Sequence, residues 1–228
     1  MVYFGLLISE IAILFLLSRK MSKTLSKFIS INFLSFLFLP GVIIHELSHL
    51  LIAAILFVPV GNMEFTPKKS DNGVKLGSVE IAKTDPIRRS IIGFAPVFVG
   101  FMIVVGIVYL FTANVLFFKD KEIYIFAIAV LGLIYLLFAI SNTMFSSSRD
   151  MEGTIEILIT LLIIFVAVYI LGFRPQLSFE KIMTKEVIEA ARKSAIFLLV
   201  PILIDLFILA VIKLFTGSRS RTHRHDRN

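Results

Sequence analysis

The sequence predicts an all-α membrane protein of about six transmembrane helices, with a small β-hairpin and an amphipathic interfacial helix. Of its 228 residues, 57% are hydrophobic and 17% are charged, whereas soluble domains carry about 25% charged residues. The mean hydropathy is +0.93. The apolar residues also form long runs, and a helix needs roughly 20 of them to cross a bilayer. The surplus of apolar side chains therefore has to face lipid.

Six apolar runs are candidates for the transmembrane helices. Together they predict a single transmembrane domain over residues 1–217, followed by a basic disordered tail over 218–228. No basic residue precedes the first run, and residues 18–20 (Ser-Arg-Lys) follow where a signal peptide would have small residues, so we expect a retained helix. The runs are residues 2–17, 29–58, 90–112, 122–143, 154–172 and 195–215.

The chain has a formal net charge of +7, and its Lys and Arg residues lie in short segments between the apolar runs. This distribution favours contact with anionic lipid headgroups over binding of nucleic acid. With six spans both termini share a side, and eleven Lys and Arg residues fall on one side and twelve on the other. The positive-inside rule therefore assigns no orientation. Cysteine is absent, which excludes disulfides and thiolate metal ligands.

Two polar stretches have their own patterns. Residues from about 60 to 82 include two short runs in which apolar and polar residues alternate, one on each side of Asn72-Gly73. This pattern predicts a β-hairpin. Because open strand edges cannot sit in lipid, the hairpin lies at the interface or borders a protected cavity, with an edge able to pair with an extended peptide. Over about 176–194, apolar residues recur at helical spacing among charged ones, which predicts a helix on the membrane surface.

Three neighbouring ionisable residues lie inside the second apolar run: His45, Glu46 and His49. Such residues are expensive at bilayer depth unless they are paired or functional. Residues four apart share a helix face, so the two imidazoles can reach one ion, with Glu46 beside them as a general base. This is the HExxH pattern of zinc hydrolases, in which Zn²⁺ activates water and polarises the scissile carbonyl. The alternative is a hydrogen-bonded polar cluster that joins helices.

A catalytic zinc ion takes three protein ligands. The only other histidines, at 223 and 225, lie in the tail, so the third ligand is expected to be a carboxylate from another span. Asp150 is the main candidate because it lies in a polar break after the fourth run, and Glu152 and Glu156 are reserve ligands. The alternative for this break is an ordinary short loop outside the membrane.

Two further acidic residues lie in apolar runs. Asp205 either supports the site, lines a water path, or packs against neighbouring helices as a protonated carboxyl. Glu10 allows the same interpretations.

The HExxH motif on an early transmembrane helix, the hairpin after it, and Asn142 eight residues before Asp150 resemble the site-2 protease family of intramembrane metalloproteases. That family's later motif is Asn-x-x-Pro-x-x-x-Leu-Asp-Gly, and the resemblance covers roughly residues 30–155, including a looser likeness of Gly93-Phe94-Ala95-Pro96 to its Gly-Pro helix. It implies Zn²⁺ held by the two histidines and Asp150, with Asn142 positioning the substrate strand. It also implies that the active site, the hairpin and both termini face the cytoplasm.

The later motif departs from the family pattern at three positions. Ser146 lies near the family's Pro, Arg149 replaces Leu, and Met151 replaces the Gly that allows close backbone approach. These changes suggest either a divergent member of the small six-span type or one whose activity has changed.

The expected function is zinc-dependent hydrolysis of a peptide bond in or near a transmembrane segment of a membrane protein substrate. One alternative is a metal or proton transporter, which predicts ionisable residues spaced along the membrane normal or in two related halves. Clustered ionisable residues and the lack of a repeat disfavour it. The other alternative is an inactive relative that binds membrane helices without cutting them.

Overall fold

The computed structural model describes residues 2–65, 68–70, 73–118, 122–145, 159–160, 162–164, 166–170 and 184–222. Within these ranges five helices are long and apolar enough to cross a membrane, which fits a multi-pass membrane protein. The predicted run 154–172 is helical wherever it is described and otherwise lies outside these ranges. The helices are α1 (Val2–Leu25), α2 (Ile31–Ile55), α3 (Pro86–Ala113), the short 3-10 helix η1 (Val115–Phe118), α4 (Ile123–Thr143) and α7 (Lys185–Thr222).

The helix ends follow local sequence signals. Ser30 and Asp85 cap α2 and α3, each accepting a hydrogen bond from the backbone N–H three residues later. The bond from the N–H of Arg88 lowers the pKa of Asp85. Pro86 is the first residue of α3, where the backbone N–H has no acceptor within the helix, so its absence in proline costs nothing. α2 ends at Ile55, and Phe57, just after the C-cap residue Leu56, has a φ of 55°, the left-handed conformation that closes many helices.

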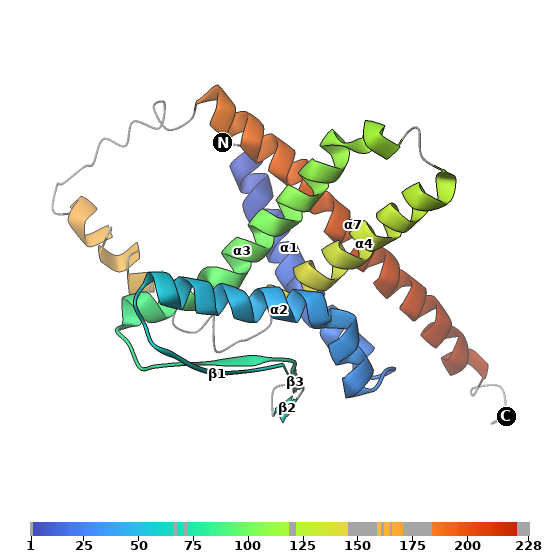
Figure 1. Cartoon of the computed structure of the whole chain (residues 1–228), viewed down its shortest axis with the longest axis horizontal. Coiled ribbons are helices and arrows are strands. Elements are labelled where there is room, and N and C mark those ends of the chain that lie inside the picture. The colour runs from blue at the N-terminus through green and yellow to red at the C-terminus, as the bar shows by residue number, and fades with distance from the viewer. Residues whose placement is uncertain are drawn as a thin grey trace.

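Helix α2 lies across one end of the group formed by the other long helices (Figure 1). Val42 packs in one core cluster with Met21, near the C-terminal end of α1, and with Phe138, near the C-terminal end of α4. Ala53 packs with Ile92, near the N-terminal end of α3. Because all these contacts involve the same end of the neighbouring helices, α2 begins and ends on one side of the molecule.

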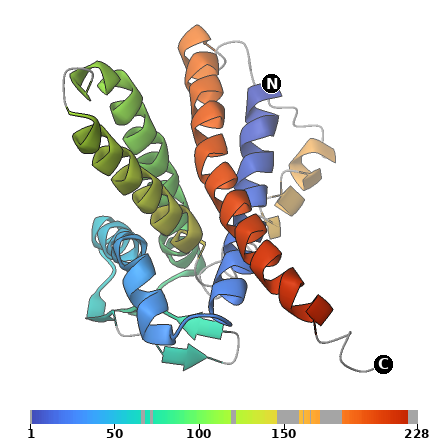
Figure 2. The same cartoon turned by 90° about the vertical axis from the view of Figure 1, so that its right-hand side faces the viewer.

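Helices α1 and α7 run side by side in the same direction, and α3 runs the opposite way (Figure 2). Leu14 shares a cluster with Leu198, and Met21 shares the next cluster with Ile208, so residue numbers rise together along the two helices. The N-terminus and the end of α7 therefore lie at opposite ends of the molecule. The six-span expectation put the two termini on one side, whereas α2 begins and ends at the same end of the other long helices; five candidate spans lie in the described ranges, and the sixth predicted run, 154–172, is described only in part.

The predicted hairpin forms beside α2, in two antiparallel segments (Figure 1). Its register shifts between Val60 and Met63, which is a bulge or similar irregularity. Gly73 pairs with Ser70 in the ladder, and the positions between them, 71–72, which include Asn72 of the predicted turn, lie outside the described residues. The paired strands are β1 (Val60–Glu64) with β4 (Ser78–Ile81) and β2 (Lys68–Ser70) with β3 (Gly73–Lys75).

The last helix corrects two expectations. Residues 185–194 do not form a separate interfacial helix; they are the first turns of α7. No Gly or Pro lies between Lys185 and Pro201 to end a helix there. The rest of that predicted helix, 176–183, lies outside the described residues. At the other end, 218–222 belong to α7 instead of a disordered tail, and 223–228 are not described.

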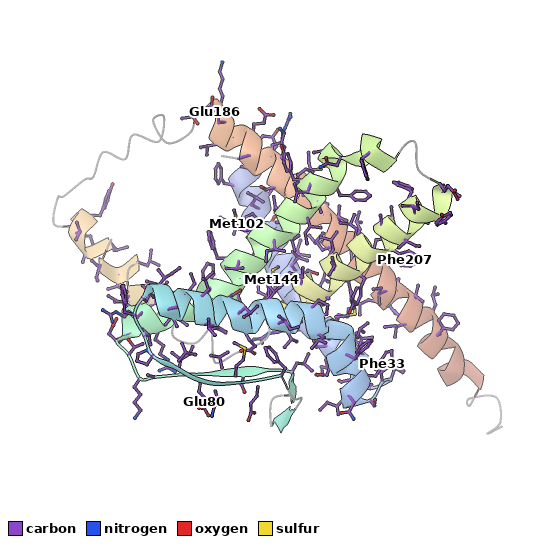
Figure 3. The ribbon with its side chains drawn as sticks, in the orientation of Figure 1. Phe33, Glu80, Met102, Met144, Glu186 and Phe207 are labelled. Carbon is purple, nitrogen blue, oxygen red and sulfur yellow. The ribbon has the colours of Figure 1, made fainter. Side chains whose placement is uncertain are left out.

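Large apolar side chains project outward from every long helix. Phe33 on α2 and Phe207 on α7, both labelled in Figure 3, are 55% and 70% exposed. In a soluble protein so many exposed apolar side chains would drive aggregation, whereas a bilayer covers them. This surface supports the membrane assignment independently of helix length.

Helices α2 and α4 approach each other closely at Gly41, one turn before His45. A Cβ built on Gly41 would overlap the hydroxyl of Thr143 and the backbone carbonyl of Ala139. Because one of these atoms is backbone, the overlap cannot be relieved by rotating a side chain. The glycine therefore lets the two helices touch beside the histidines.

We expect Gly41→Ala to lower the free energy of unfolding by about 1–3 kcal/mol, the usual cost of overpacking a core. The measurement is thermal unfolding of the purified protein in detergent. Gly132→Ala in α4 is the matched control, since a Cβ at Gly132 would meet nothing within 4 Å. Equal unfolding temperatures for the two variants would contradict the close contact.

Candidate metal centre

His45 and His49 face each other on one side of α2, as their spacing predicts. Both are buried, and their Nε2 atoms lie 3.2 Å apart. Two nitrogen ligands at about 2.0–2.1 Å from a tetrahedral zinc ion are separated by about 3.3 Å. The pair therefore has the separation that two ligands of a single zinc ion need.

The second nitrogen of His49 fixes which ring atom carries the proton. Its Nδ1 lies 2.8 Å from the backbone carbonyl oxygen of Ile92 in α3. A carbonyl only accepts, so Nδ1 is the donor and Nε2 of the neutral ring presents a lone pair. Metal-binding histidines are commonly held in this way by a carbonyl or carboxylate. For both Nε2 atoms to bind one metal ion, His45 would also have to carry its proton on Nδ1, so that each ring offers an Nε2 lone pair.

Glu46 is buried next to the histidines and lies against the hairpin. A Cβ at Gly77 would come within 2.8 Å of both Glu46 Oε1 and a methyl carbon of Val42. Glycine is thus what allows the chain to pass so close to α2 just before β4. Leu76 packs in the same core cluster as Val42 and anchors the hairpin there. Position 77 was not singled out from the sequence, where its only signal is an isolated glycine beside a strand pattern.

Asn142 and Asp205 form a buried polar pair between α4 and α7. Asn142 donates from Nδ2 to Asp205 Oδ1 at 2.7 Å and to the carbonyl of Phe138 at 3.0 Å. Asp205 is 0% exposed, so the interpretation of a carboxyl packed against neighbouring helices is the one that the structure supports. In the described part of the chain, Asn142 Oδ1 and Asp205 Oδ2 have no hydrogen-bond partner. The amide oxygen of Asn142 therefore keeps its capacity to accept.

Glu10 is also buried, on α1, and its Oε2 atom finds no hydrogen-bond partner within the described ranges. Its neighbours along α1, Leu14 and Leu17, belong to the core shared with α7. The residue therefore packs between helices and is not part of the histidine pair.

The carboxylates expected to complete the site, Asp150, Glu152 and Glu156, lie outside the described residues. Within the described ranges, no group of three or more His, Cys, Asp or Glu residues is arranged to hold a metal ion. What the structure brings together is the two imidazoles.

Comparisons of the chain with protein-family models, with curated proteins and with solved structures gave no match. The fold defines a multi-pass helical membrane protein. Any more specific function has to be argued from the geometry around His45, Glu46 and His49.

Proposed function

We propose that the chain is a zinc-dependent intramembrane endopeptidase, which hydrolyses a peptide bond in or near a transmembrane segment of another membrane protein. The observation that carries the proposal is the 3.2 Å separation of the two Nε2 atoms. In addition, His49 donates from Nδ1 to the carbonyl of Ile92, which puts the lone pair of the neutral ring on Nε2. This separation matches that of two ligands of one zinc ion, which favours a zinc site over a polar cluster that only joins helices. The likeness to the site-2 protease family supplies the substrate class.

Asp150 is the proposed third ligand, with Glu152 and Glu156 as reserves. Ile44, next to His45, packs against the core cluster that contains Met144 and Phe145 at the end of α4. Five residues of extended chain span at most about 17 Å. The chain after Phe145 thus starts beside the helix that carries the histidines, which leaves Asp150 within reach of them.

The chemistry divides between the metal and the chain's own side chains. Bound Zn²⁺ would supply an activated water and polarise the scissile carbonyl. Glu46 would take the proton that the attacking water loses as its oxygen bonds to the carbonyl carbon. The same carboxyl would return the proton to the amine nitrogen as the C–N bond breaks. Burial of Glu46 near Gly77 shields it from bulk water.

The hairpin is the proposed platform for the substrate. In the described ranges β1 and β4 pair only with each other, so the sheet keeps an open edge that an extended peptide can join. Because Gly77 brings the start of β4 against Glu46, a peptide added to this sheet would lie near the general base. Asn142 would add an acceptor for a backbone N–H of the peptide.

We further propose that the hairpin end of the molecule faces the cytoplasm, with the N-terminus on the other side. The end of α1, the hairpin, the start of α3 and the end of α7 lie at that end (Figures 1 and 2), and these segments hold most of the Lys and Arg residues in the described ranges. The start of α7, at the opposite end, holds Lys185, Arg192 and Lys193. Basic residues concentrate on the cytoplasmic side of membrane proteins.

Single cysteines test this orientation cleanly because the chain has none of its own. With a membrane-impermeant maleimide, we expect Ser26→Cys, after α1, to react only from the cytoplasmic side. Glu122→Cys, before α4, should react only from the outside. Strict alternation of six spans would place both positions on the same side, so labelling of both from one side would contradict the arrangement.

The function itself is tested with purified protein and a transmembrane reporter substrate in liposomes. We expect about one zinc per chain, cleavage of the reporter, and loss of cleavage after chelation that returning zinc reverses. Zinc flux without cleavage would instead indicate a transporter. Bound zinc with neither cleavage nor flux would indicate an inactive, helix-binding relative.

A further inference from the structure

Pro96 lies inside α3, where it interrupts the helical hydrogen bonds. In an α-helix the N–H of each residue bonds the carbonyl four positions earlier, and proline has no N–H. The carbonyl that Pro96 leaves without its usual donor belongs to Ile92. Both residues are fully buried in the described structure, so bulk water does not reach this carbonyl to replace the donor.

The carbonyl of Ile92 is the one that His49 bonds. Nδ1 of His49 donates to it at 2.8 Å, from a different helix. A backbone carbonyl left unsatisfied inside a membrane protein is destabilising, and a side chain of a neighbouring helix can restore the bond. The proline on α3 and the histidine on α2 are therefore complementary: one removes a donor and the other supplies it.

We propose that Pro96 is a positioning residue for His49. By keeping the carbonyl of Ile92 free of its helical donor, it holds the imidazole in the Nδ1-protonated tautomer and turns the Nε2 lone pair toward His45. The metal part of this inference rests on the proposed function. The tautomer does not, because it is a property of the metal-free protein.

Replacing Pro96 restores the missing donor. In Pro96→Ala the new N–H competes with His49 for the carbonyl of Ile92, so the ring is expected to populate both tautomers. Nitrogen-15 NMR of the four histidine rings in the metal-free protein reports this directly, with the His49 signals assigned from the His49→Ala spectrum. Loss of an outer partner of a metal-binding histidine typically weakens metal affinity about 10–100-fold, so the zinc Kd should rise by that factor.

Two further variants make the test specific. Pro96→Gly also restores the N–H but adds no Cβ, so it should reproduce the effect even if alanine disturbs the packing. Pro201→Ala restores an N–H in α7, in a helix that carries neither histidine, and should leave the His49 tautomer and the zinc Kd unchanged.

Each outcome decides a separate question. Wild-type tautomer populations and zinc Kd in both Pro96 variants would overturn the role of Pro96. A tautomer shift in a protein that binds no zinc would uphold the positioning role but refute the proposed function. Zinc-dependent cleavage by the wild type, with no tautomer shift in the variants, would refute only the positioning role.

Discussion

Glu46→Gln is expected to lower the rate of reporter cleavage by about 10²–10⁴-fold, the usual contribution of a general base. Glutamine keeps the size of the side chain, so the close contact with Gly77 survives and the fold should not change. The amide of the glutamine side chain cannot accept a proton from the attacking water. Because the proposed ligands are untouched, the zinc content should stay near one per chain, measured by elemental analysis of the same preparation.

The matched control for this change is Glu122→Gln. Glu122 is exposed at the start of α4, at the end of the molecule away from the hairpin, and caps the helix without a side-chain hydrogen bond. The Glu122→Gln variant should cleave the reporter at the wild-type rate. If Glu46→Gln cleaves as fast as this control, then Glu46 is not the base and the proposed mechanism is wrong.

His45→Ala and His49→Ala should each reduce bound zinc from about one per chain to an undetectable level, and abolish cleavage. Each variant leaves a single imidazole in place of a pair spaced for one ion, and zinc sites need at least three protein ligands. His49→Ala also removes the donor to the carbonyl of Ile92, which should cost about 1–3 kcal/mol of stability. Metal analysis and thermal unfolding separate the two effects.

The remaining histidines provide the control. His223 and His225 lie beyond the last described residue of α7, and a double change of both to alanine should keep the zinc and the activity. Full zinc content in His45→Ala or His49→Ala would show that the metal is held elsewhere. The pair on α2 would then be a structural polar cluster.

Local patterns predicted those parts of the protein that depend on neighbours in sequence. Long apolar runs predicted the helices α1 to α4 and α7 because a helix satisfies its own backbone and needs only apolar side chains to sit in lipid. The spacing of His45 and His49 predicted that their rings share a face, since helical periodicity follows from backbone geometry alone. The hairpin was predicted from alternating apolar and polar residues, and two antiparallel strand pairs form there.

Long-range packing decided the features that local patterns do not contain. The number of apolar runs predicted six alternating spans, whereas α2 lies across one end of the other long helices, and the start of α1 and the end of α7 lie at opposite ends of the molecule. From the sequence, the role of Asp205 in its apolar run stayed open between supporting the site, lining a water path and packing against helices. Only the hydrogen bond from Asn142 shows which groups surround its carboxyl. Each of these depends on how helices distant in sequence pack.

The sequence by itself determined the membrane class, the helices and the two imidazoles on one face, because these follow from composition and from the period of the α-helix. Only the tertiary structure decided that Gly77 touches Glu46 and that the carbonyl left without its helical donor by Pro96 receives a hydrogen bond from His49. A missing backbone donor can be read from a sequence. Which side chain replaces it depends on which helices meet, and that is decided by packing across the whole chain.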